Sequence, residues 1–280
     1  MTAACAGIAS KGFLAERLRG PAPLMLGLAI TLATGAGGCT KKSEPAPEPA
    51  AATAPGTGPS AAAATPGVAG AFGTGVISGT VKLKGKAPEM KPVTTPDPFC
   101  ARQPIKEEDI VTGAGNGLRN VVIRVVKGAT GTYQAPKTAA LVDQSGCMYR
   151  PRVQVVMAGQ PVQIQNSDQT LHNVHTYRGP STMFNQAQIP GMAPITKTFA
   201  DGGQLVKFKC DVHPWMTGYI AIATNPFSAV SDADGNFKIE KLPPGAYTLE
   251  AWHERIGTKT ADVQVAADQG ATVAFELAMP

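Results

Sequence analysis

Apolar and polar residues alternate along most of the chain from residue 76 onward. The runs that show this are VISGTVKL (76–83), NVVIRVVK (120–127), VQVVMAGQPVQIQ (153–165) and QLVKFKC (204–210). A period of two predicts β-strands, and the Gly-Gln-Pro sequence inside the third run predicts a turn between two of them. After residue 40 no segment has a convincing amphipathic helical period, so we predict an all-β protein.

The pattern changes near residue 225, where the runs become shorter and the turns more frequent. The segment AVSDADGNFKIEKLPPGAYTLEAWHE (229–254) contains Asp-Gly and Pro-Pro-Gly turn signals, and TADVQVAA and ATVAFELAM follow with strict alternation. We therefore predict two β-domains, a larger one over residues 76–224 and a small β-sandwich over residues 225–280.

Composition supports this interpretation and argues against nucleic acid as a partner. Hydrophobic residues make up 43% of the 280 residues, and 31 Gly and 24 Pro are available for turns. The net charge is +5 and the positive residues are scattered. Without a basic run or stripe, the chain has no footprint for binding nucleic acid.

The N-terminal 38 residues have the pattern of an export signal. Three positive residues precede an apolar run over residues 24–36 that is too short to span a bilayer, and the run leads to AGGC, ending at Cys39. This resembles a bacterial lipoprotein signal, which implies loss of residues 1–38 and a lipid on Cys39. Residues 39–75, rich in Ala, Pro and Gly, would be a tether to the periplasmic face or cell surface. The alternative is an ordinary cleaved signal.

Export implies an oxidising compartment, where a free thiol is unusual. Cys5 would leave with the signal and Cys39 would carry lipid, while Cys100 and Cys147 can pair in a disulfide. The alternative for that pair is two buried free thiols. Cys210 is left without a partner.

The stretch KCDVHPWM places three soft side chains, Cys210, His213 and Met216, within seven residues. A thiolate, an imidazole and a thioether suit copper, and a second imidazole would complete a type 1 site. His172 and His175 are the nearest upstream histidines, and in a strand they face opposite sides. Strand parity alone does not choose between them. The alternative is a buried thiol, a core methionine and a surface histidine.

LHNVH followed about 35 residues later by CDVHPWM resembles the cupredoxins, amicyanin in particular. The resemblance implies a Greek-key β-sandwich that holds one type 1 copper ion. It implies that the ligands are His172, Cys210, His213 and Met216, with Asn173 and Pro214 beside them and His175 outside the set. It further implies that electrons pass through an exposed edge of His213, with Trp215 beside it where a redox partner would dock.

The C-terminal segment resembles the carboxypeptidase regulatory-like domain, a non-catalytic transthyretin-like β-sandwich. Chains that join these two modules, with DQSGCMYRP ahead of the histidine strand, form a bacterial group that is often named after methylamine utilisation. This chain resembles that group. In such relatives we expect a histidine where this chain has Arg152, and its absence here argues against an extra ligand or a second metal at that position.

These features together predict one-electron transfer by a membrane-anchored copper protein with a redox protein as donor or acceptor. We expect no catalytic residues and no enzyme activity, because no phosphate loop or nucleophile-elbow pattern occurs. Two alternatives are open: binding or delivery of copper without electron transfer, and docking or adhesion through the C-terminal sandwich.

Overall fold

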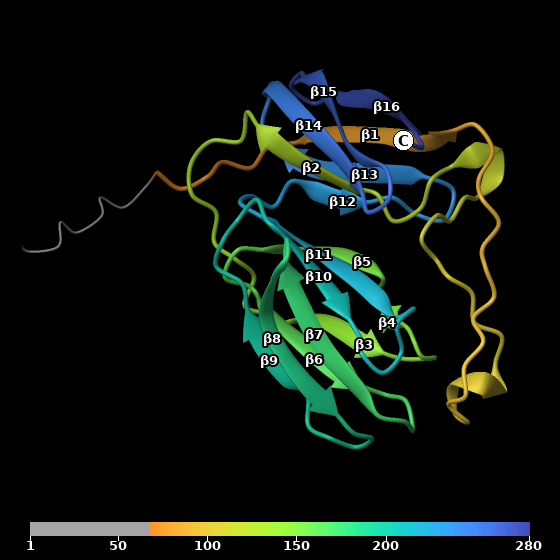
Figure 1. Cartoon of the computed structure of the whole chain (residues 1–280). Helices are drawn as coiled ribbons and strands as arrows, with labels where there is room; N and C mark the ends of the chain where they lie inside the picture. Colours follow the sequence, from red (N-terminus) through yellow and green to blue (C-terminus); the bar gives the residue numbers. More distant parts are fainter. Residues whose placement is uncertain (1–67) are drawn as a thin grey trace, which may run out of the picture. The chain divides into compact units, whose positions relative to one another are not determined.

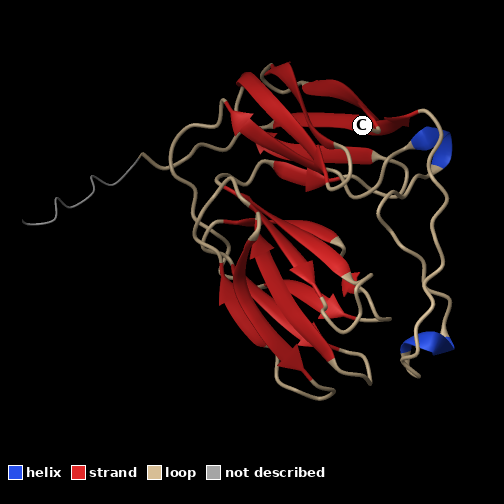
Figure 2. Ribbon diagram, in the orientation of Figure 1, coloured by secondary structure: helices blue, strands red, loops and turns tan. Residues whose placement is uncertain are grey.

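The computed structural model describes residues 68–280, and the expected signal and most of the tether lie outside them. Regular structure in this part of the chain is β-strand apart from two short 3-10 helices (Figure 2), which confirms the all-β prediction. No helix in residues 68–280 is long and apolar enough to cross a membrane. The elements are β1 Gly75–Lys84, η1 Cys100–Arg102, η2 Ala114–Asn116, β2 Val122–Lys127, β3 Ala140–Gln144, β4 Tyr149–Arg150, β5 Val153–Met157, β6 Pro161–Asn166, β7 His172–Arg178, β8 Ser181–Gln188, β9 Ile195–Thr198, β10 Leu205–Lys209, β11 Thr217–Ala223, β12 Ser228–Val230, β13 Asn236–Leu242, β14 Gly245–His253, β15 Gly257–Val265 and β16 Gly270–Ala278.

Strands β3 to β11 form one sandwich, here called the first sandwich (Figure 1). One sheet has the order β5-β11-β10-β7-β8 and the other β4-β3-β6-β9. Because side chains alternate along each strand, one face of each sheet supplies apolar groups to a shared core. That core includes Val162 and Ile164 from one sheet and Val174, Phe208 and Ile220 from the other.

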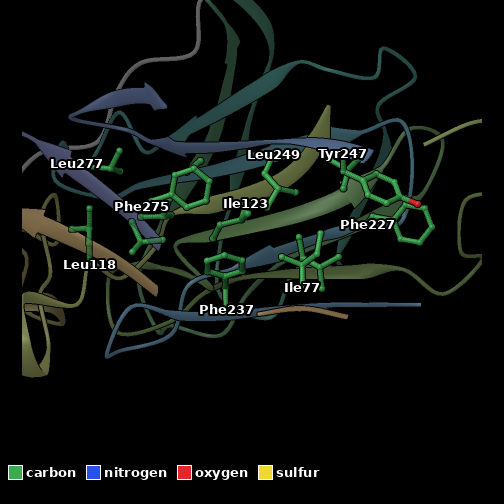
Figure 3. Packing of buried hydrophobic residues seen from close by; sticks show 14 of the residues in the cluster. Ile77, Leu118, Ile123, Phe227, Phe237, Tyr247, Leu249, Phe275 and Leu277 are labelled. Carbon is green, nitrogen blue, oxygen red and sulfur yellow. The ribbon is translucent and has the colours of Figure 1, made fainter. Parts of the chain in front are cut away.

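The remaining strands form the second sandwich, with sheet orders β13-β1-β16 and β12-β2-β14-β15. Its core is aromatic and aliphatic and includes Ile77, Ile123, Phe237, Leu249 and Phe275, all buried (Figure 3). Residues from distant parts of the sequence thus share one apolar interior.

Two strands that the sequence assigned to the domain at residues 76–224 lie in the second sandwich instead. Strand β1 pairs in parallel with β16, from Val76 opposite Gly270 to Lys84 opposite Ala278. Strand β2 pairs with β12 and β14. The expected division at residue 225 is therefore wrong for these strands. Alternation identifies a strand and its buried face, but it does not identify the sheet that the strand joins.

The connection between β1 and β2 includes an irregular hairpin over residues 91–107, here called the cover hairpin. Its two arms meet where Val93 N–H donates to the carbonyl of Ile105 (2.9 Å) and Glu107 N–H donates to that of Lys91 (2.9 Å). Its tip contains η1. The disulfide between Cys100 and Cys147, the pair expected from the sequence, joins this tip to the first sandwich.

A buried ion pair joins a residue before β5 to a residue after β14. The Arg152 side chain is 2% exposed and donates through Nε to Glu254 (2.7 Å), which is 4% exposed. The same guanidinium donates to Asp109 (3.0 Å) and to the carbonyl of Thr217 (3.2 Å). Arg152, next to β5 of the first sandwich, is thus paired with Glu254, next to β14 of the second.

We predict that Glu254→Gln destabilises the protein. The substitution leaves the buried guanidinium without its fully buried counter-charge, and removing one partner of such a pair typically costs about 3–5 kcal/mol. Chemical denaturation would measure the change in the free energy of unfolding. Glu276→Gln is the matched control, because its pair with Lys84 is exposed and long (3.8 Å). Equal stability of the two variants would contradict the prediction.

Candidate metal centre

Strand β7 decides which of the two candidate histidines faces the core. His172, Val174 and Thr176 are each 0% exposed, so the inward face of this strand begins with His172. His175 lies on the outer face, where Nδ1 contacts Asp211 (2.9 Å) and Nε2 contacts the hydroxyl of Thr182 (2.9 Å). The structure therefore places His172 in the interior and His175 outside it.

Cys210 and Met216 are brought back together by a short hydrogen-bonded loop after β10. Cys210 N–H donates to the carbonyl of Met216 (3.2 Å), and Met216 N–H donates to that of His213 (2.9 Å). Cys210 and Met216 are 0% exposed and His213 is 1% exposed. All three soft side chains of this loop are thus removed from water.

Three ligand atoms converge in the first sandwich. The Nδ1 atoms of His172 and His213 are 2.9 Å apart, and the Cys210 sulfur lies 3.9 Å and 3.8 Å from them, respectively. A metal bound at about 2.0–2.1 Å from nitrogen and 2.3 Å from sulfur separates its ligand atoms by roughly 3–4 Å. Two imidazoles and one thiolate are also the in-plane donors of a type 1 copper site. The residues present therefore fit a copper ion.

Two further groups of potential ligands lie close by, but each includes a cysteine of the disulfide. One combines Asp97 and His213 with Cys100, and the other combines Asp168 and His172 with Cys147. A sulfur engaged in a disulfide is not a thiolate donor. Among the described residues, Cys210 is the free cysteine.

Asn173 links the histidine strand to the cysteine loop. Its side-chain Oδ1 accepts Asp211 N–H (2.6 Å), its side-chain Nδ2 donates to the Asp211 carboxylate (2.9 Å), and its backbone N–H points at the Cys210 sulfur (3.5 Å). Tyr149 adds a second link, because its hydroxyl lies within hydrogen-bond distance of the backbone carbonyls of Asn173 (2.8 Å) and Lys209 (3.0 Å). These contacts fix the separation of the two elements that carry the ligand atoms.

The outer nitrogens of both imidazoles contact carboxylates that sequence reasoning missed. Nε2 of His172 lies 2.9 Å from Asp168, and Nε2 of His213 lies 3.2 Å from Asp97. A carboxylate in this position holds Nε2–H and directs the Nδ1 lone pair toward a metal. Asp168 stands four residues before His172, in a loop of no recognisable motif. Asp97 lies more than a hundred residues before His213. No local sequence pattern therefore predicted that either carboxylate would contact its histidine.

The electrostatics of this cluster favour an ionised sulfur. Burial raises the pKa of the Cys210 thiol, but hydrogen bonds from His172 and from backbone N–H groups outweigh burial and lower it below its usual range. Burial also opposes protonation of His172, yet Asp168 and Cys210 raise its pKa overall. Burial and the neighbouring His172 lower the pKa of His213. These surroundings favour the ionised form of the Cys210 sulfur and the neutral form of the His213 imidazole.

The expectation that His213 reaches the surface is wrong. The ring is 1% exposed because the cover hairpin lies over it. Trp215 is half-buried and donates through Nε1 to the carbonyl of Cys147 (3.0 Å), while Pro214 is exposed. Pro214 and Trp215 line a surface hollow together with residues 92–97 of the cover hairpin. His213 also belongs to the lining of this hollow, although its ring is almost fully buried.

Comparison with known proteins identifies the C-terminal part and returns weaker likenesses elsewhere. The family model of the carboxypeptidase regulatory-like domain matches residues 220–278, which confirms the domain expected there. A purple cupredoxin from Nitrosopumilus maritimus is 21% identical with a TM-score of 0.27, over 30% of this chain and 99% of that one. A reduced amicyanin variant is 19% identical with a TM-score of 0.28, over 36% of this chain and 97% of that one.

A copper-containing nitrite reductase from Thermus scotoductus SA-01 is 22% identical with a TM-score of 0.29, over 36% of this chain. The match spans 25% of that reductase. No curated protein sequence matched the chain.

Alkylation without reductant tests the cysteine arrangement. In denaturant we expect Cys210 to be alkylated and the peptides of Cys100 and Cys147 to remain cross-linked, because only Cys210 is a free thiol in residues 68–280. Peptide mass spectrometry distinguishes the forms, and a reduced sample is the control. Recovery of alkylated Cys100 and Cys147 from the unreduced exported protein would contradict this arrangement and restore two further candidate ligands.

Proposed function

We propose that this chain is an exported copper protein that transfers single electrons through one type 1 site. The residues that would hold the ion in this proposal are His172, Cys210 and His213, together with Met216. The observation that carries it is the buried meeting of the two Nδ1 atoms with the Cys210 sulfur within 3.9 Å. A disulfide beside a free thiol fits an oxidising compartment in which a metal protects the thiol.

Copper in such a site would supply reversible exchange of one electron at a positive potential. The chain's own residues would keep the donor atoms in place in both oxidation states. Asn173 and Tyr149 tie the ligand-bearing elements together, and burial keeps water away from the sulfur. We propose an electron carrier without enzyme activity, with a redox protein as its partner.

The proposed location is a bacterial membrane surface, with the chain anchored by lipid on Cys39 and held by the tether. Lipid attachment would keep the copper domain close to membrane-bound redox partners. Intact mass measurement of the membrane-extracted protein tests this, since removal of residues 1–38 and addition of lipid change the mass together.

One observation favours a second candidate, copper binding or delivery without electron transfer. In the first candidate the His213 edge would exchange electrons, but this edge is covered and contacts Asp97. A third candidate, docking or adhesion through the second sandwich, has only the regulatory-like family match in its favour. The optical behaviour of the copper-loaded protein separates the first two.

We predict that the mature protein, loaded with copper and oxidised, shows an intense visible charge-transfer band. Cys210→Ser should abolish this band, because the thiolate–copper bond produces it, while the far-ultraviolet circular dichroism should stay that of a β-protein. Absorption spectroscopy of both proteins is the measurement. A wild-type protein that binds copper yet stays colourless under oxidant would favour the delivery role, and a coloured Cys210→Ser variant would exclude Cys210 as the ligand.

The two histidines of β7 provide a matched pair of substitutions. His172→Gln should lose or strongly alter the visible band, whereas His175→Gln should leave it nearly unchanged, because only His172 faces the Cys210 sulfur. Copper stoichiometry and absorption would be compared for both variants. The reverse ranking would mean that the metal lies on the outer face of β7.

A further inference from the structure

Asp97 of the cover hairpin is a charged residue whose side chain points at the proposed metal ligand His213. Its Oδ1 accepts N–H groups of Phe99 (2.8 Å) and Cys100 (2.9 Å). Its Oδ2 accepts the hydroxyl of Thr170 (2.7 Å) and lies 3.2 Å from Nε2 of His213. Both oxygens therefore have fixed donors, and the carboxylate has little freedom to turn away from the imidazole.

The disulfide connects this carboxylate to its counterpart on the other imidazole. Cys100 donates its N–H to Asp97, and Cys147 donates its N–H to Asp168 (2.7 Å), which contacts His172. Each half of the disulfide thus positions one carboxylate behind one candidate ligand. The Cys100 sulfur itself lies 3.7 Å from Nε2 of His213, so the disulfide and the ring are in direct contact.

The hairpin that carries Asp97 adds no strand to either sheet of the first sandwich. Its Cys100 and Ile105 join the buried core of that sandwich, and its contacts with the ligand cluster come from the tip residues and the disulfide. Asp97 is 17% exposed at the side chain, and its two oxygens accept from two backbone N–H groups and one hydroxyl, which suits a carboxylate. It is therefore an anion at neutral pH, placed on the outer edge of His213.

We propose that Asp97 is a positioning residue that holds His213 with Nδ1 toward Cys210 and, through its charge, favours the oxidised over the reduced metal. This rests on the proposed function. A fixed negative charge behind an imidazole raises its basicity as a ligand and stabilises the higher charge of Cu²⁺ more than that of Cu⁺. The cover hairpin is then a device that sets the redox equilibrium of the site as well as a lid over His213.

Asp97→Asn tests the charge, because the amide has nearly the same shape and keeps an oxygen acceptor. We expect the affinity for Cu²⁺ to fall about 10–100-fold, as for other partners of ligating histidines, with a smaller loss for Cu⁺. The reduction potential should therefore rise. Competition with chelators for each ion and a spectroscopic redox titration measure the two effects.

Asp201→Asn is the matched control, since it removes the same charge from an exposed pair with Arg178, at the far end of β7 from His172. Equal potentials and affinities in Asp97→Asn and Asp201→Asn would overturn the proposal.

A measurement on the metal-free protein separates this proposal from the proposed function. Nitrogen-15 NMR of the imidazoles should show His213 as the Nε2–H tautomer in the wild type and as a mixture in Asp97→Ala. An unchanged tautomer in that variant would overturn the positioning role, whether or not copper binds. Absence of a visible band in the copper-loaded wild type would instead reject type 1 copper. The tautomer measurement would then still test whether Asp97 positions His213.

Discussion

The meeting of a buried thiol with two buried imidazoles is the constraint on which the rest of the first sandwich depends. Polar groups removed from water destabilise a fold unless hydrogen bonds replace those they lose. Here the replacement is extensive: Asp168 and Asp97 contact the outer ring nitrogens, and Asn173 N–H points at the sulfur. The surrounding residues thus hold the donor atoms together, which is what the proposed redox site would require.

The cover hairpin shields this cluster from solvent. It buries His213, occupies its outer nitrogen with Asp97 and is attached by a disulfide, so the cover is a permanent part of the fold. The surface hollow beside it is lined by Pro214, Trp215 and the proline-rich arm of the hairpin. Access to the centre from this side is therefore governed by a segment from outside the sheets of the first sandwich.

The second sandwich is not an appendage that begins where the first one ends. Strands β1 and β2 precede the ligand-bearing strands in sequence and pair with β12 to β16, which follow them. Along the sequence, the strands of the first sandwich therefore lie between two groups of strands of the second. Arg152 and Glu254 add a buried ion pair between residues of the two. Truncation near residue 225 would remove the partners of β1 and β2, so the role of the second sandwich has to be tested by surface substitutions.

Local features of the sequence were sufficient to predict strands, the loop of Cys210, His213 and Met216, and the unpaired state of Cys210. These features depend on side-chain alternation, on spacing within a few residues and on the chemistry expected of a thiol in an oxidising compartment. The choice of His172 over His175 needed either a family resemblance or the observed inward face of β7, because both residues fit a strand.

Only the tertiary structure assigned β1 and β2 to their sheet and placed Asp97 against His213. Sheet partners and ligand supports are contacts between residues that lie tens to hundreds of positions apart. Such contacts depend on how the whole chain packs, and no local pattern encodes them.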